Sequence, residues 1–194
     1  METELKIRAA KVEDAKDLVK IYSYYVENTA VSYEYVTPTV EEFQGRIENT
    51  LKKYPYLVAE KEGKMIGYAY AGQFQKRKAY SWNAEMTVYL DRDSRGMGAG
   101  PKLYRLLESI LKAQGVIKAV ALVTRPNTTD PTYHYNSKDF HEKMGYRMTG
   151  CLEQSGYKFG RWYDTLLMGK PLNEPQEDMS EIRTFDEVRH LFAL

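Results

Sequence analysis

The sequence predicts an α/β domain in which helices cover both faces of a mixed, mostly antiparallel sheet. Three observations carry this prediction. Segments with alternating apolar residues are interspersed with segments whose apolar residues recur at helical spacing. Three of the strand-like segments follow one another with short connections, which is typical of antiparallel pairing. A chain of 194 residues with 43% hydrophobic and 28% charged residues suits one folded domain rather than a disordered chain.

The first half of the chain predicts one strand, two helices and a hairpin. Residues 5–9 alternate between apolar and charged, and from residue 15 the apolar positions follow a helical period. Thr39 and Glu42 have the spacing of a capping box, so a second helix should run from about 40 to 53. Residues 56–60 and 65–71 then predict two strands joined by a tight turn at residues 62–64.

The second half predicts the remaining strands and helices. We expect strands at residues 80–90 and 116–124, with a glycine-rich break and a helix ending near Gly115 between them. A short helix at 137–144 and an antiparallel pair at 146–154 and 161–169 complete a domain over residues 1–170. The tail, residues 171–194, begins as a linker and holds a second capping box, Thr184 with Glu187. We expect it to form a short helix that docks on the domain or on a second subunit.

Composition excludes several function classes. The 28 basic and 27 acidic residues leave a net charge of +1, so no overall basic field favours nucleic acid or an anionic membrane surface. The single cysteine, Cys151, and three histidines argue against a metal site. An acidic N-terminus without an apolar core, and the lack of a stretch of about 18 apolar residues, predict a cytoplasmic protein.

The strongest local signal is a glycine-rich loop between a strand and an amphipathic helix. Glycines let the backbone approach a ligand, and the helix N-terminus favours phosphate. The loop lacks the Lys-Ser/Thr ending of a Walker motif and the third glycine of a dinucleotide fingerprint. We expect its residues to bind a phosphate-bearing cofactor: Arg95, Gly96, Met97, Gly98, Ala99 and Gly100.

What the loop does match is Arg-x-x-Gly-x-Gly, formed by Arg95, Gly98 and Gly100. With this motif the chain resembles the GCN5-related N-acetyltransferase (GNAT) superfamily, and within it the phosphinothricin and methionine-sulfoximine acetyltransferases. The resemblance extends over about residues 5–170. The segments that carry it, in order, are residues 21–26, 31–35, 67–72, 74–80, 85–89 and 158–162. It implies the GNAT fold, acetyl-coenzyme A as co-substrate and a homodimer.

The resemblance also implies cofactor contacts outside the loop. Backbone groups of Val88, Tyr89 and Leu90 should pair with the pantetheine arm and the acetyl carbonyl, because the strand separates there from its neighbour. Asn136 and Ser137 lie near the place of two further contacts. Relatives often carry a basic residue where Pro101 stands, and proline has neither charge nor amide hydrogen, so we expect weaker cofactor binding.

Two residues are candidates for the chemistry. The resemblance implies that Glu85 is the general base, directly or through water, and that His141 or water protonates the leaving thiolate. The alternatives are a solvated strand carboxylate for Glu85 and a structural helix histidine for His141.

The acceptor site implied by the resemblance is aromatic with one cation. Arg77 could pair bidentately with a carboxylate, and the alternative for the aromatic residues is sheet packing. The predicted acceptor-binding residues are Tyr33, Tyr35, Phe74, Arg77, Tyr80, Trp82 and Thr87.

These residues together predict an acetyl-coenzyme A-dependent N-acetyltransferase. We expect direct attack by the amine of a small amino acid or analogue, such as phosphinothricin, methionine sulfoximine or methionine sulfone. Two alternatives stay open. One changes the acceptor to a polyamine, an aminoglycoside or a protein N-terminus. The other is a non-catalytic sensor that binds an acyl-coenzyme A, because a fold alone does not fix a function.

Overall fold

The protein is seen in a computed structural model that describes residues 5–94, 96–126 and 137–194. None of the helices in these ranges is long and apolar enough to cross a membrane. The elements, in chain order, are β1 (Lys6–Ala9), α1 (Ala15–Asn28), α2 (Val40–Leu51), β2 (Tyr56–Lys61), β3 (Lys64–Gln73), β4 (Asn83–Leu90), α3 (Ala99–Gln114), β5 (Lys118–Pro126), α4 (Ser137–Lys143), β6 (Arg147–Lys158), β7 (Arg161–Pro171) and α5 (Phe185–Val188).

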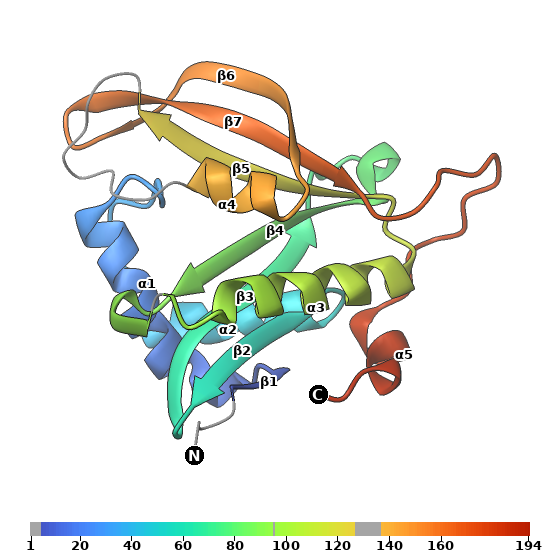
Figure 1. Cartoon of the computed structure of the whole chain (residues 1–194), viewed down its shortest axis with the longest axis horizontal. Coiled ribbons are helices and arrows are strands. Elements are labelled where there is room, and N and C mark those ends of the chain that lie inside the picture. The colour runs from blue at the N-terminus through green and yellow to red at the C-terminus, as the bar shows by residue number, and fades with distance from the viewer. Residues whose placement is uncertain (1–4, 95, 127–136) are drawn as a thin grey trace.

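One seven-stranded sheet runs through the molecule in the order β1-β2-β3-β4-β5-β7-β6. Its neighbouring strands are antiparallel except for β4 and β5, which are parallel. Figure 1 shows β2, β3 and β4 on one side of the molecule and β5, β7 and β6 on the other. The predicted mixed, mostly antiparallel sheet is confirmed.

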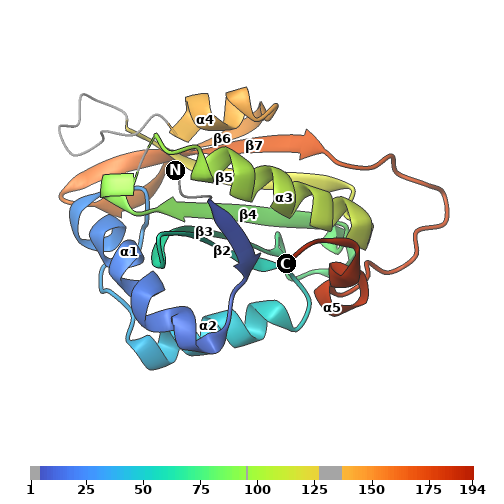
Figure 2. The same ribbon diagram turned by 60° about the horizontal axis from the view of Figure 1, so that its bottom comes forward.

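Helices cover both faces of the sheet (Figure 2). Each face packs against its helices in a separate hydrophobic core. Against α3 the strands present small side chains such as Ala69, Ala71 and Ala84, which let the helix lie close to the sheet. Against α1 and α2 they present larger rings, among them Tyr56 and Tyr68, which pack with apolar residues of both helices. Side chains alternate along a strand, so each strand contributes to both cores.

Local signals in the sequence explain the starts and ends of several elements. The side chain of Thr39 accepts a hydrogen bond from the amide of Glu42, whose carboxylate accepts one from the amide of Thr39, so the predicted capping box begins α2. In the hairpin turn Glu62 and Gly63 have φ of 53° and 75°. Gly115, at φ 93°, ends α3.

Two predicted strand boundaries were wrong by three residues or more, and other strand ends differ by one or two residues. The strand predicted from residue 80 begins at Asn83, because Lys78–Tyr80 forms a 3-10 turn. The strand predicted to end at residue 154 continues to Lys158. Two irregularities in its pairing, between Met148 and Gly150 and between Leu152 and Gly156, interrupt the regular alternation of side chains along this strand.

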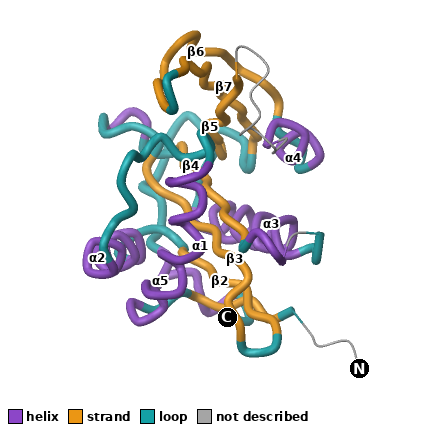
Figure 3. The backbone as a smooth tube through the Cα atoms, turned by 90° about the vertical axis from the view of Figure 1, so that its left-hand side faces the viewer, coloured by secondary structure: helices purple, strands orange, loops and turns teal. Residues whose placement is uncertain are grey.

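The tail docks on the domain itself. The amide of Phe185 donates to the carbonyl of Lys53, and the side-chain amide of Gln114 donates to the carbonyls of Lys53 and Arg183. Ile182, Phe185 and Val188 are buried in the same core as α3. Figure 3 shows α5 at the end of the molecule far from β6 and β7. Of the two expected docking sites, the structure therefore shows the domain.

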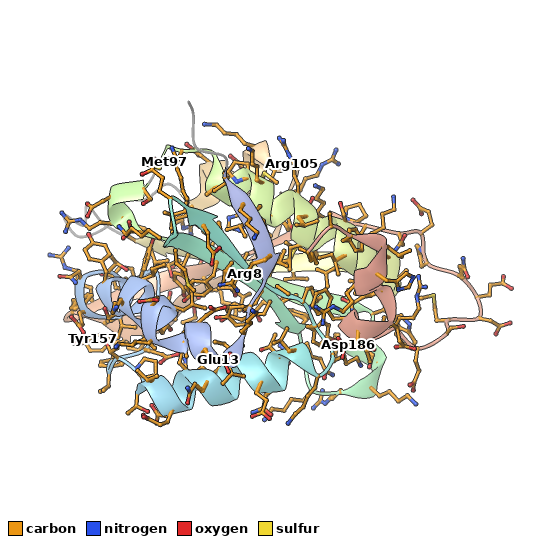
Figure 4. All side chains as sticks on the ribbon, turned by 90° about the horizontal axis from the view of Figure 1, so that it is seen from below. Arg8, Glu13, Met97, Arg105, Tyr157 and Asp186 are labelled. Carbon is orange, nitrogen blue, oxygen red and sulfur yellow. The ribbon has the colours of Figure 1, made fainter. Side chains whose placement is uncertain are left out.

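The tail should therefore contribute to stability. Replacing Phe185, which is 1% exposed, by alanine should lower the free energy of unfolding by about 3–5 kcal/mol, because it removes a fully buried ring. Denaturant titration measures this value. Asp186→Ala is the matched control, since Asp186 lies on the exposed side of the same helix (Figure 4). A loss below about 1 kcal/mol for Phe185→Ala would show that the tail does not belong to the folded core.

Candidate active site

The central feature of the site is the separation of the two parallel strands. β4 pairs with β5 only from Asn83 to Glu85, opposite residues 118–120, and the strands then diverge (Figure 1). Elsewhere each of them keeps its outer partner, β3 or β7. The C-terminal half of β4 therefore has one backbone edge turned toward the gap.

The register decides which residues face the gap. The amide of Asp91 donates to the carbonyl of Ile66 and the amide of Phe74 to that of Asn83, so odd-numbered residues of β4 bond to β3. The even-numbered residues, Val88 and Leu90, turn their amides and carbonyls toward β5. The register does not favour the predicted backbone contact of Tyr89 with a cofactor, because its peptide groups face β3.

Leu90 already has a partner inside the protein. The hydroxyl of Tyr25 donates a hydrogen bond to the carbonyl of Leu90 at 2.6 Å. It also accepts one from the amide of Leu90 at 3.3 Å. Of the three predicted residues, Val88 thus best fits a backbone contact with a ligand in the gap.

The glycine loop follows β4 after a short 3-10 turn, Arg92–Ser94, and leads into α3. Gly96 and Gly98 have φ of 80° and 77°, a region that favours glycine. Gly100 brings the start of α3 close to its neighbours, because a Cβ there would lie 3.2 Å from Leu90 Cδ1, a tight contact, and 3.5 Å from the ring of Phe140. Met97 is 47% exposed at this end of α3 (Figure 4). Arg95 lies outside the described residues.

Helix α3 presents its first amides at this loop. In the first turn the amides of Ala99 and Gly100 have no intrahelical acceptor, whereas Pro101 has no amide hydrogen. The helix dipole adds a partial positive charge at the same place. The loop and helix start can therefore bind an anionic group next to the gap.

Glu85 lies on the opposite side of β4 from α3, at the point where the strands begin to separate. It shares a sheet face with Thr87 and pairs in register with Gly72 of β3. A Cβ on Gly72 would meet nothing within 4 Å, so there is open space beside the carboxylate. Burial raises the pKa of Glu85 above its ordinary value. A half-buried carboxylate beside open space can accept a proton from a bound molecule.

The sequence around this gap and loop matches one known family. Residues 7–167 match the acetyltransferase (GNAT) domain. The chain belongs to the GNAT acetyltransferase family. The fold and the enzyme class predicted from the sequence are thereby confirmed.

Relatives of this acetyltransferase cover most of its length. It is 36% identical over 160 residues to a phosphinothricin N-acetyltransferase of Streptomyces viridochromogenes, which covers 82% of this chain and 84% of that protein. It is 30% identical over 164 residues to an L-methionine sulfoximine/L-methionine sulfone acetyltransferase of Pseudomonas aeruginosa, covering 84% and 91%. The structure of a phosphinothricin acetyltransferase from Sinorhizobium meliloti in complex with acetyl-coenzyme A has a TM-score of 0.81 at 31% identity, covering 95% and 99%.

The described residues of the acetyltransferase fit acetyl-coenzyme A, the acetyl donor of the family. The first amides of α3 would meet its pyrophosphate, and Val88 would pair with its pantetheine arm in the gap. When bound, acetyl-coenzyme A supplies an acetyl group on an activated thioester. Asn136 lies outside the described residues, and Ser137 begins α4.

Both ring nitrogens of His141 are hydrogen-bonded within the protein. Its Nδ1 lies 2.7 Å from the carbonyl of Ser137, which can only accept, so Nδ1 carries the hydrogen. Its Nε2 therefore accepts from the hydroxyl of Tyr104 at 2.9 Å in the neutral ring. Burial lowers the pKa of His141, which favours that neutral form. In this arrangement His141 has no free N–H for a leaving thiolate, and it orients Tyr104.

The predicted acceptor residues divide into two groups. Phe74 and Tyr80 form an edge-to-face ring pair in the β3–β4 connection, where Arg77 is exposed. Tyr33 and Tyr35 lie between α1 and α2 and contact β6 and β7 instead.

The side chain of Trp82 bonds to the tail. Its indole N–H donates to the carbonyl of Ser180 at 2.8 Å, so the tail uses this side chain. This geometry does not support the expectation that Trp82 contacts the acceptor. The alternation of residues 80–90 could not reveal that the tail, about 100 residues later in the chain, covers the Trp82 side chain.

Sequence reasoning missed two tyrosines on the face of Glu85. Burial raises the pKa of the Tyr70 hydroxyl, and the hydrogen-bonding contact with Thr87 opposes this shift. The ring of Tyr22, on α1, meets that of Tyr89 edge-on at 5.0 Å. The pairing of Tyr70 with Thr87 could have been predicted from the alternation of side chains along β3 and β4. The contact of Tyr22 of α1 with this face could not.

Replacing Pro101 should change cofactor binding. Pro101→Arg adds an amide hydrogen and a charge in the first turn of α3, so the KM for acetyl-coenzyme A should fall about threefold to tenfold. Initial rates at saturating acceptor measure this. Pro175→Arg in the tail is the control for added charge. An unchanged or raised KM for Pro101→Arg would contradict the interpretation of this position.

Proposed function

We propose that this acetyltransferase acetylates the α-amine of a small amino acid or analogue, of the kind represented by phosphinothricin, methionine sulfoximine and methionine sulfone. The observation that carries the proposal is the half-buried Glu85 beside the open space at Gly72, at the point where β4 and β5 separate. The names of the relatives in Streptomyces viridochromogenes and Pseudomonas aeruginosa support the acceptor class.

Glu85 would take the proton that the amine loses as its nitrogen attacks. The new bond joins this nitrogen to the acetyl carbon, and the carbon–sulfur bond breaks. The amide of Val88, which faces the gap, would donate to the acetyl oxygen as negative charge develops on it. We assign the proton of the thiolate to water, because both ring nitrogens of His141 are occupied.

Arg77 would bind the carboxylate of the acceptor. It is exposed in the β3–β4 connection next to the ring pair of Phe74 and Tyr80, beyond the end of the strand that holds Gly72. A guanidinium can hold a carboxylate through two parallel hydrogen bonds. An acceptor with a free α-carboxylate therefore fits this site better than a polyamine does.

We also propose that the protein is cytoplasmic and forms a homodimer. Apolar side chains on β5 and β6 support the dimer: Leu122 is 45% exposed and Leu152 is 54% exposed. Sedimentation of the purified chain tests the dimer, and a monomer at micromolar concentration would exclude it.

The role of Glu85 gives a test with a pH signature. Below its pKa the carboxylate is protonated and cannot accept a proton, so kcat/KM should fall as the pH falls through a value above the ordinary range of a glutamate. Glu85→Gln should lower kcat about 10²- to 10³-fold and remove this acid limb. Steady-state rates over a pH series measure both effects. Glu153→Gln, an exposed residue of β6, is the control. Full turnover in Glu85→Gln would remove Glu85 from the role of base.

A panel of acceptors tests the substrate class. Thiol release from acetyl-coenzyme A should be seen with the methionine analogues and not with spermidine or an aminoglycoside. Arg77→Gln should raise the KM of the active acceptors about tenfold, because it removes the partner of the carboxylate. Lys76→Gln, also exposed in the same loop, is the matched control. Activity confined to polyamines would overturn the assignment of Arg77.

A further inference from the structure

One end of strand β6 contacts the loop that connects α1 with α2. The contacts come from Gly156, Tyr157 and Lys158, three consecutive residues. We refer to residues 29–35 as the acceptor loop, because this segment carries Tyr33 and Tyr35, two of the residues predicted to bind the acceptor. The reaction described above uses none of the three β6 residues.

Lys158 binds the acceptor loop through its ammonium group. The Nζ atom lies 2.6 Å from the carbonyl oxygen of Val26, 2.9 Å from that of Thr29 and 2.7 Å from that of Ser32, and the residue is 2% exposed. An ammonium has three N–H donors, so all three are used. Val26 lies in the last turn of α1, where carbonyls have no intrahelical donor.

The ammonium of Lys158 remains charged near neutral pH although it is buried. Burial lowers the pKa of Lys158 to about 8, and the carboxylate of Glu34 opposes this shift. The ring of Phe159 lies 5.0 Å from Nζ. A lysine that is nearly fully buried against backbone carbonyls, without a hydrogen-bonded carboxylate, holds the chain in place rather than serving as a surface charge.

Gly156 provides the second contact. A Cβ on this residue would lie 2.3 Å from the Cζ atom of Tyr33, so the ring of Tyr33 rests directly on the bare backbone of β6. The hydroxyl of Tyr33 reaches the carbonyl of Asp164 and the hydroxyl of Thr165 on β7, both at 3.4 Å. The third contact comes from the hydroxyl of Tyr35, which donates to the carbonyl of Tyr157.

The acceptor loop is in turn connected to the face of Glu85. The hydroxyl of Ser32 lies 2.7 Å from that of Tyr22, which donates to Glu34 at 3.0 Å. The ring of Tyr22 packs on Tyr89, which lies on the same face of β4 as Glu85. Through Ser32 and Tyr22 the loop is therefore linked to the aromatic side chains on the face of β4 that carries Glu85.

We propose that Lys158 and Gly156 are positioning residues that hold the acceptor loop against the face of β4 that carries Glu85, where the loop would form one wall of the acceptor site. The inference rests on the proposed function for the location of that site. Binding of the acceptor should then depend on these two residues, whereas binding of acetyl-coenzyme A, on the other side of the gap, should not.

Gly156→Ala is the sharper of two variants, since it moves only a flexible ring. Its added methyl group must displace the ring of Tyr33, so the KM of the acceptor should rise about tenfold, with the KM of acetyl-coenzyme A unchanged. The control is Gly150→Ala on the same strand, where a Cβ would meet only Leu167 Cδ1, at 3.8 Å. An unchanged acceptor KM, or an equal rise of both KM values, would overturn the proposal.

Amide hydrogen exchange tests, in the absence of any acceptor, whether Lys158 holds the acceptor loop in place. In Lys158→Met the amides of residues 29–35 should exchange at least about tenfold faster than in the parent, while those of α3 keep their rates. Faster exchange across the whole domain would show a general structural role and overturn the proposal. If no amine is acetylated in the panel, the proposed function fails, and the exchange result alone decides whether β6 holds this loop.

Discussion

The separation of β4 from β5 is the constraint on which the remaining structure depends. A parallel pair inside a sheet normally continues its hydrogen bonds, and unpaired buried backbone groups cost about 1–3 kcal/mol each. Here pairing stops at Glu85 and Val120, so other contacts must keep the two halves of the sheet in one molecule. Helix α3 does this from one face, since Leu103 and Leu107 lie in a core that also includes strands of both halves.

The two faces of the sheet carry different side chains at the gap between β4 and β5. On the side of α3, small side chains and glycines bring a helix N-terminus close to the end of β4. On the other side, tyrosines and a carboxylate occupy the corresponding positions of the same strands. Because side chains alternate along a strand, β4 presents an apolar face toward α3 and Glu85 toward the acceptor side. A cofactor and an acceptor can therefore meet at one strand without sharing binding residues.

The sequence predicted the elements and the glycine loop well because their signals are local. A capping box such as Thr39 with Glu42, or glycines at positive φ such as Gly98, act within a few residues. His141 shows the limit of this reasoning. Its type and position suggested a proton donor, but its Nε2 is taken by Tyr104 of α3, a contact set by packing between helices, while its Nδ1 bonds to the carbonyl of Ser137 one turn earlier in α4.

Long-range contacts explain the other differences from the predicted site. Trp82 follows the alternation predicted for residues 80–90 but lies just before β4, and its indole bonds to the tail. The peptide groups of Tyr89 face β3 because of the register with that strand, which a single segment does not reveal. Tyr22 reaches the face of Glu85 through the tilt of a helix against the sheet.

The docking of the tail has a consequence for the order of folding. Phe185 completes a core whose other members, among them Leu57 and Leu103, come from much earlier in the chain. During synthesis the hairpin, α3 and the glycine loop leave the ribosome before the residues that close this core, and contacts between distant segments form slowly. The nascent domain thus exposes an apolar surface beside α3 until residues 182–188 have emerged, and a chaperone that binds apolar segments would meet its target there.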